Sequence, residues 1–255
     1  MTVRLSTGTR NGLAQGLGFG GMFNGGRIEI YSGSQPATAD AAATGTLLGT
    51  VTSGSGALTK ETRATATLTV TGGSGTLADV TVGTFNICPD LSFAPVVWAT
   101  STTVTAALIA DAINRNGYAE ATSAAAVVTV KLRPGAGVCT LALATTGITC
   151  TGSSFAGGVA VVNGLYLGTA ASGAIAKPSA QVWSFNGVAA GTAGWFRFYG
   201  SDTADSGAII SAAPYFPRID GSVAVSGADM NLSNISITVS GPTTIDTFSW
   251  TQPAA

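Results

Sequence analysis

The stretch TVTAALIADAINRNGY, residues 103–118, carries the clearest helical pattern in the chain. Its apolar residues recur at spacings of three and four, which places them on one stripe of an α-helix. The stripe consists of Val104, Leu108, Ile109, Ala112 and Ile113. Gly117 stands where a glycine commonly ends a helix. We therefore predict a helix over about residues 103–116.

Strand patterns lie on both sides of this helix. ATATLTV (residues 64–70) precedes it and AVVTVKL (126–132) follows it, and both alternate between the two faces of a strand. WFRFY (195–199) and ISITV (235–239) show the same alternation further along. A weaker helical pattern covers residues 7–17, and the glycine-rich GLGFGG (16–21) is predicted to be a pliable N-terminal arm. The chain is therefore predicted to be mainly β, with antiparallel sheets.

The order of these patterns predicts two domains. One helix between several strands describes a small α+β domain over residues 61–159. The flanks, residues 1–60 and 160–255, then form one discontinuous, antiparallel β-sandwich-like domain that carries the small domain as an insertion in a loop.

The surface is expected to be poor in charge. Charged residues make up 9% of the chain, against about 25% in typical soluble domains, and the net charge is −1. A net charge this small gives no long-range electrostatic field to steer the chain onto nucleic acid. Its Lys and Arg residues are also scattered along the sequence, so we predict no nucleic-acid partner. No apolar run approaches the roughly 18 residues of a membrane span, and the glycine-broken N-terminus makes a poor signal peptide, so we also predict no membrane partner.

The sequence offers little to catalysis. It has no histidine, which excludes Ser-His-Asp and Cys-His nucleophiles and histidine-bearing zinc sites. Aspartates in glycine- and serine-rich segments, Asp202, Asp205, Asp220 and Asp229, are predicted to cap turns. The three cysteines are predicted to be buried thiols. We predict no catalytic residue, no cofactor and no metal, and hence no enzyme.

Longer stretches of the flanks resemble a family of tailed-bacteriophage virion structural proteins. They are LSTGTRNGL (5–13), FNGGRIEIYSGSQPATADAAATGTLLGT (23–50), AKPSAQVWSFNGVAAGTAGWFRFYG (176–200) and PRIDGSVAVSGADMNLSNISITVSGPTTIDTFSW (217–250). The inserted domain is similar to a small strand-and-helix module of phage tail and surface proteins, through TATLTVTGG (65–73), TAALIADAINRNGYAEATSAAAVVTVKLRPGAG (105–137) and FAGG (155–158). The resemblance implies a structural component of a virion assembled in the host cytoplasm.

Aromatic residues supply the first candidate interface. In WFRFY the alternation puts Trp195, Arg197 and Tyr199 on one face and Phe196 and Phe198 on the other. Trp, Tyr and Arg are enriched at interface hot spots, so the first three are predicted to pack under the inserted domain or a neighbouring protein. A sugar-stacking platform is the alternative, and it requires Trp195 and Tyr199 to be exposed.

Two further segments complete the predicted interface. Residues 33–46 are small and nearly uncharged. They have too little apolar bulk for a core and too little charge for a solvated tail, so we predict that this segment extends against a partner. Tyr31, Gln35 and Pro36 are predicted to be among the contacts. PYFPRIDG (214–221) holds Tyr215 and Phe216 between prolines, either as a preformed contact or folded onto its own domain.

These features lead to one expectation and two alternatives. The chain is expected to bind the outer face of a major capsid protein lattice as a decoration or cement protein, lattice-bound or homo-oligomeric. The first alternative is a neck or tail component such as a collar, tube or baseplate protein. The second is a carbohydrate-binding surface module.

Overall fold

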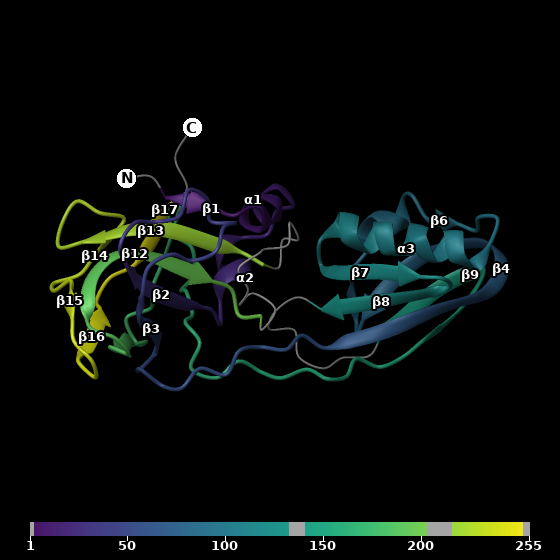
Figure 1. The fold of residues 1–255 in the computed structure, drawn as a ribbon. Coiled ribbons are helices and arrows are strands. Elements are labelled where there is room, and N and C mark those ends of the chain that lie inside the picture. The colour runs from purple at the N-terminus through teal and green to yellow at the C-terminus, as the bar shows by residue number, and fades with distance from the viewer. Residues whose placement is uncertain (1–2, 133–140, 203–215, 252–255) are drawn as a thin grey trace. The chain divides into compact units, whose positions relative to one another are not determined.

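The computed structural model of the protein describes residues 3–132, 141–202 and 216–251 (Figure 1). The chain divides into two compact units. Unit 1 comprises Met1–Glu61 and Ala160–Ala255, and unit 2 comprises Thr62–Val159. Among the described residues, no helix is both long and apolar enough to cross a membrane.

Unit 1 is built on a nine-stranded sheet. Its main path runs β1 (Arg4–Leu5), β13 (Arg218–Ala224), β12 (Gly191–Tyr199), β2 (Arg27–Ser32), β3 (Leu47–Ser53), β11 (Trp183–Asn186) and β16 (Pro242–Ile245), with β14 (Met230–Asn231) beside β13 and β15 (Ser236–Ile237) beside β12. The β13–β14 pair is parallel and the others are antiparallel. A second sheet pairs β10 (Ala174–Ala176) with β17 (Ser249–Thr251).

The apolar core of unit 1 lies on one face of the large sheet. Ile28 and Ile30 of β2 alternate with polar neighbours, as do Phe196 and Phe198 of β12, and all four are buried. Trp250 of β17 packs against the same core, so the two sheets enclose it in a sandwich-like arrangement. The alternation of apolar and polar residues along each strand decides this face, because successive side chains point to opposite sides of a sheet.

Two short helices close the core of unit 1. Helix α1 (Thr7–Ala14) begins at Ser6, whose side chain accepts a hydrogen bond from Thr9 N. Helix α2 (Phe19–Phe23) buries Phe19, Met22 and Phe23. Residues 16–21 were predicted to be a pliable arm, and this is wrong: Phe19, with Met22 and Phe23 directly after the segment, gives α2 an apolar face that packs into the core.

Unit 2 is a six-stranded antiparallel sheet with a helix across one face, as Figure 1 shows. The long strand β4 (Thr65–Val82) pairs on one side with β8 (Val127–Leu132), β6 (Val96–Val97) and β5 (Phe85–Asn86), and on the other with β9 (Leu141–Gly152). Strand β7 (Ala119–Ala124) pairs with β8. A short 3₁₀ helix, η1 (Pro89–Ser92), follows β5.

The predicted helix is α3 (Thr102–Asn116), capped by Ser101 at its start and by Gly117 with φ 69° at its end. Its buried face differs from the predicted stripe. Ile109, Ala112 and Ile113 are buried, whereas Val104 and Leu108 are 44% and 41% exposed. Thr105 takes the inward position instead, because its hydroxyl accepts a hydrogen bond from Ala99 N and donates one to Ser101 O, which satisfies it inside the core.

The mainly β, antiparallel fold class predicted from the alternation is confirmed. WFRFY lies within β12 and AVVTVKL contains β8. Within ISITV only Ser236 and Ile237 form a strand, the short β15, and these two residues pair with β12. Cys88 is buried and Cys150 half-buried, and both are free thiols; Cys139 lies outside the described residues.

Candidate functional site

The second face of the large sheet in unit 1 is polar and aromatic, and it collects most of the residues singled out in the sequence. Three adjacent strands bring their outward residues into register across this face. Tyr31, Trp195 and Ser222 form one row, Glu29, Arg197 and Asp220 the next, and Arg27, Tyr199 and Arg218 the third. We call these nine residues the polar face.

A buried ion pair lies at the centre of the polar face. Arg197 Nε donates to Asp220 Oδ1 at 2.6 Å, and Arg197 Nη2 donates to Asp220 Oδ2 at 2.7 Å. Both side chains have 0% exposure. Burial disfavours the charged guanidinium, but the two hydrogen bonds and the charge of Asp220 outweigh it and raise the pKa of Arg197. The pair is therefore a fixed structural element of the sheet.

Glu29 links the two rows beside this pair. It accepts a hydrogen bond from Arg27 Nε at 2.7 Å and another from the Tyr31 hydroxyl. Burial raises the pKa of the carboxyl, but the charge of Arg27 and these hydrogen bonds more than compensate, so the pKa of Glu29 lies below its ordinary value. Burial and the neighbouring Glu29 carboxylate raise the pKa of Tyr31, which keeps its hydroxyl a donor.

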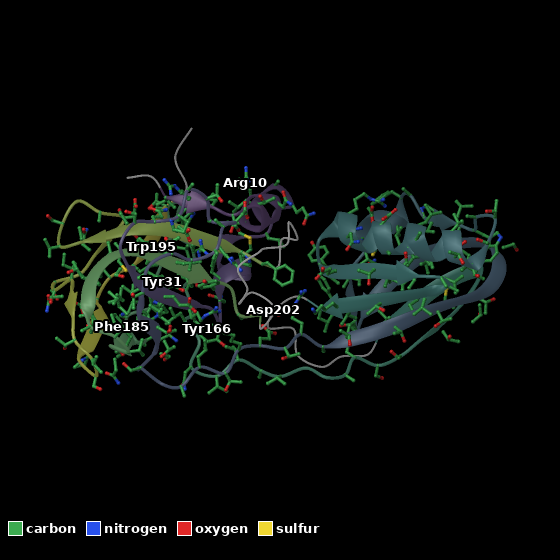
Figure 2. The ribbon with its side chains drawn as sticks, viewed as in Figure 1. Arg10, Tyr31, Tyr166, Phe185, Trp195 and Asp202 are labelled. Atoms are coloured by element: carbon green, nitrogen blue, oxygen red, sulfur yellow. The ribbon has the colours of Figure 1, made fainter. Side chains whose placement is uncertain are left out.

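The aromatic rings of the polar face are stacked. The rings of Tyr31 and Trp195, both labelled in Figure 2, are stacked with centroids 4.6 Å apart and planes at 12°. The guanidinium carbon of Arg27 lies 4.0 Å from the centroid of the Tyr199 ring, and that of Arg218 lies 5.3 Å from it. With Arg197 at 5.9 Å, three cations lie near this one ring, and the cation–π contacts offset part of the cost of burying them.

Residues 33–46, which we call the covering loop, lie over the polar face. The carbonyl of Ala41 accepts a hydrogen bond from Arg197 Nη1 at 2.9 Å, and that of Thr44 accepts one from Trp195 Nε1 at 3.2 Å. Asp40 accepts bonds from Thr7 N and Thr7 Oγ1, both at 2.8 Å, and so places a carboxylate at the start of α1. Small residues suit this loop because they let its backbone carbonyls reach buried donors.

The predictions for this region therefore need correction. Tyr31, Trp195 and Tyr199 are 8%, 0% and 4% exposed, and Arg197 is fully buried. A sugar platform requires exposed rings, so that reading of Trp195 and Tyr199 is wrong. These side chains pack under the chain's own covering loop, which leaves them no surface to offer a neighbouring protein.

The other residues of the predicted interface differ in how far they are buried. Pro36 is buried and its carbonyl accepts a hydrogen bond from Arg4 Nη1. Gln35 is half-buried, and its buried Nε2 has no hydrogen-bond partner among the residues the structure describes. Phe216 is half-buried, and Tyr215 lies outside the described residues. These hydrogen bonds anchor residues 33–46 to unit 1, so the segment is not a free arm, and its contact with a partner stays a prediction.

A groove of about 450 Å³ borders the polar face where Arg27 and Glu29 lie. Its other lining residues are Thr50, Thr52, Ser55, Gly56, Ala57, Leu58, Lys60, Asn186 and Val188. The lining offers hydroxyls and one ion pair but no aromatic ring on which a sugar could stack.

The aspartates divide between two roles. Asp229 accepts bonds from Ser222 N and Ser222 Oγ, as expected of a residue that satisfies a local backbone. Asp220 was predicted to cap a turn, but it lies within β13 and pairs with Arg197. Asp202 is buried beside Glu61, and Asp205 lies outside the described residues. Within residues 3–132, 141–202 and 216–251, no three His, Cys, Asp or Glu side chains gather as metal ligands.

Sequence reasoning missed Arg27, Glu29 and Arg218, and it gave Asp220 a different role. The available signal was the alternation itself: RIEIYS and RIDGS each place two charged residues two positions apart, and WFRFY places Arg197 on the same face as its Trp and Tyr. Three strands with the same polar–apolar alternation, placed side by side, must gather those charges on one face.

Unit 2 presents a different surface. The sheet face opposite α3 exposes a row of hydroxyls from neighbouring strands, among them Thr67, Thr129 and Thr122, which are paired in register. Large apolar side chains are also exposed: Phe93 is 92% exposed and Val97 59% exposed.

Comparison of the chain with family models, with curated proteins and with solved structures gave no match.

Proposed function

We propose that this chain is a non-enzymatic structural protein of a tailed-bacteriophage virion, and that it decorates and stabilises the outer face of the capsid lattice. The proposal starts from the likeness of its flanks to virion structural proteins. It gains support from the way the fold uses its charges.

The observation that carries the proposal is that the chain buries several of its few charged side chains. The chain has only 11 basic and 12 acidic side chains. Several of them are buried: Arg27, Glu61, Arg63, Arg197, Asp202, Arg218 and Asp220. The remaining surface therefore consists largely of neutral small residues. Covering such a surface with a neighbouring protein requires little desolvation of ions, so it suits a permanent place in an assembly.

The exposed apolar side chains support the same role. In unit 2 they include Phe85, Phe93, Val97, Val104, Leu108 and Val159, and in unit 1 they include Tyr166, Val182 and Val188. No single one makes a large anchor. Many modest contacts repeated over a symmetric lattice bind strongly through avidity, and a decoration protein depends on contacts of this kind.

The test is the number of copies of this chain in each purified virion, measured by quantitative mass spectrometry with the major capsid protein as internal reference. Decoration of the shell predicts one copy per capsid subunit or a simple lattice fraction of it. A handful of copies would instead place the chain in a closed ring at the neck or tail. Absence from the purified virion would overturn the structural role altogether.

A second measurement separates decoration from mere incorporation. Virions assembled without this chain are expected to release their DNA at a lower temperature than complete virions, because the shell loses its external contacts. Addition of the purified chain should restore the release temperature. Equal release temperatures with and without the chain would rule out a stabilising role on the capsid.

A further inference from the structure

Strand β9 (Leu141–Gly152) leaves an open edge on the sheet of unit 2. It pairs with β4 along one side, and the described residues include no strand on its other side. An unpaired edge presents a row of backbone N–H and C=O groups, and native proteins usually protect such edges.

Three other sheet edges in the described parts of the chain, those of β1, β16 and β7, are protected. In unit 1, β1 is only two residues long and β16 begins with Pro242. In unit 2, the opposite edge is β7, where Asn114 of α3 donates to Ala121 O and accepts from Ala121 N, both at 2.8 Å. This side chain therefore occupies backbone groups that an added strand would use.

Strand β9 has one bulge but no charged residue or proline to protect its edge. Its twelve residues, LALATTGITCTG, include no Asp, Glu, Lys, Arg or Pro. The register shifts between β4 and β9 skip residues mostly on β4, namely Thr71, Ser74, Gly75 and Ala78, while β9 skips only Thr146. Most of the irregularity thus lies on the inner strand. The bulge of β9 at Thr146, beside Gly147 with φ 88°, leaves residues 148–152 as an uninterrupted edge of about 17 Å.

We propose that the open edge of β9 pairs with the β9 edge of a second copy of this chain, antiparallel and about a two-fold axis. The two six-stranded sheets then form one continuous sheet. The inference does not depend on the virion assignment.

Charge is the reason to assign a second copy as the occupant. An edge without charged residues carries no pattern that would select a different strand. It also places no like charges opposite each other when it pairs with itself. A two-fold axis lets the same edge serve both copies, which closes the assembly at a dimer through this contact.

The experiment is sedimentation equilibrium of the full chain over about a hundredfold range of concentration, since association by mass action depends on concentration. The wild-type chain is expected to show a reversible monomer–dimer equilibrium. The double variant Thr149→Lys/Thr151→Lys puts two charges on exposed positions of β9. Because both copies carry them, its dimer dissociation constant should rise at least about tenfold.

Two control variants identify the surface involved. Thr129→Lys places one such charge on the same sheet face, but on the inner strand β8, and it should leave the dissociation constant unchanged. Phe93→Ser removes the most exposed aromatic side chain in unit 2 and should also have no effect. Circular dichroism checks that each variant keeps the wild-type fold.

Three outcomes would overturn the proposal. They are a wild-type chain that stays monomeric at every concentration, a Thr129→Lys variant that weakens association as much as the double variant, and association that is lost in Phe93→Ser. Hydrogen exchange gives an independent readout: the outward amides of β9 should exchange more slowly in the concentrated sample than in the dilute one.

Discussion

Arg197 and Asp220 lie opposite each other on β12 and β13 and form two hydrogen bonds, of 2.6 and 2.7 Å, with both side chains fully buried. Around them, Glu29, Tyr31, Trp195 and Tyr199 complete one face of the sheet. The pair joins two consecutive strands, whereas Glu29 and Tyr31 come from β2, much earlier in the sequence.

Removing one partner of this pair should be strongly destabilising. Arg197→Met leaves the Asp220 carboxylate buried without its partner, and we expect unfolding free energy to fall by about 3–5 kcal/mol. The double variant Arg197→Met/Asp220→Leu should recover most of that loss, because it leaves no unpaired charge. Urea unfolding measures the free energy of unfolding of both variants, provided that the m-value is unchanged. Arg115→Met, which breaks the exposed pair with Asp90, is the control and should cost less than about 1 kcal/mol.

The covering loop should resist proteolysis in the native chain. Asp40→Ala removes the acceptor of the bonds from Thr7 N and Thr7 Oγ1, so we expect faster cleavage within residues 33–46 and a loss of about 1 kcal/mol in stability. Thr38→Ala, at an exposed position of the same loop, should behave as wild type. Limited proteolysis followed by mass spectrometry gives the cleavage sites. Rapid cleavage of the wild-type loop would contradict its anchoring.

Acid should weaken unit 1 through Glu29. Its pKa in the folded chain lies below the ordinary value of 4.5, so the unfolded chain binds its proton more readily. The stability that Glu29 contributes is therefore present above about pH 4.5 and is lost as the pH falls through the lower, folded-state pKa. Urea unfolding between neutral and acid pH should show a smaller acid-dependent loss in Glu29→Gln than in wild type. Identical pH profiles would disprove this role.

Glycine is required at position 49 but not at position 21. A Cβ on Gly49 would lie 2.0 Å from Phe185 Cδ2 in the core, so Gly49→Ala should destabilise the chain by about 1–3 kcal/mol. A Cβ on Gly21 of α2 would meet nothing within 4 Å, and Gly21→Ala should stabilise it by about 0.4–1 kcal/mol. Thermal unfolding of the two variants should therefore shift in opposite directions. A rise in melting temperature for Gly49→Ala would show that Phe185 moves aside.

Local patterns predicted much of the fold because they follow from backbone geometry. The alternation in WFRFY and AVVTVKL specifies strands whatever their neighbours are, and Gly117 ends α3 because it adopts a left-handed conformation. The same reasoning predicted where α3 lies in the sequence, but it did not predict which of its residues are buried. Thr105 turns inward and Leu108 outward, because the packing of the helix on its sheet and the hydrogen bonds of Thr105 set that face.

The sequence by itself determined that this chain is mainly β, poor in charge and without a histidine, and that Trp195, Arg197 and Tyr199 share one face of a strand. Only the tertiary structure decided what covers that face. The carbonyl that binds Arg197 belongs to Ala41, 156 residues earlier in the chain. Side-chain alternation repeats every two residues and can be read locally, but the register between distant strands, and the loop that closes over them, depends on contacts across the whole unit.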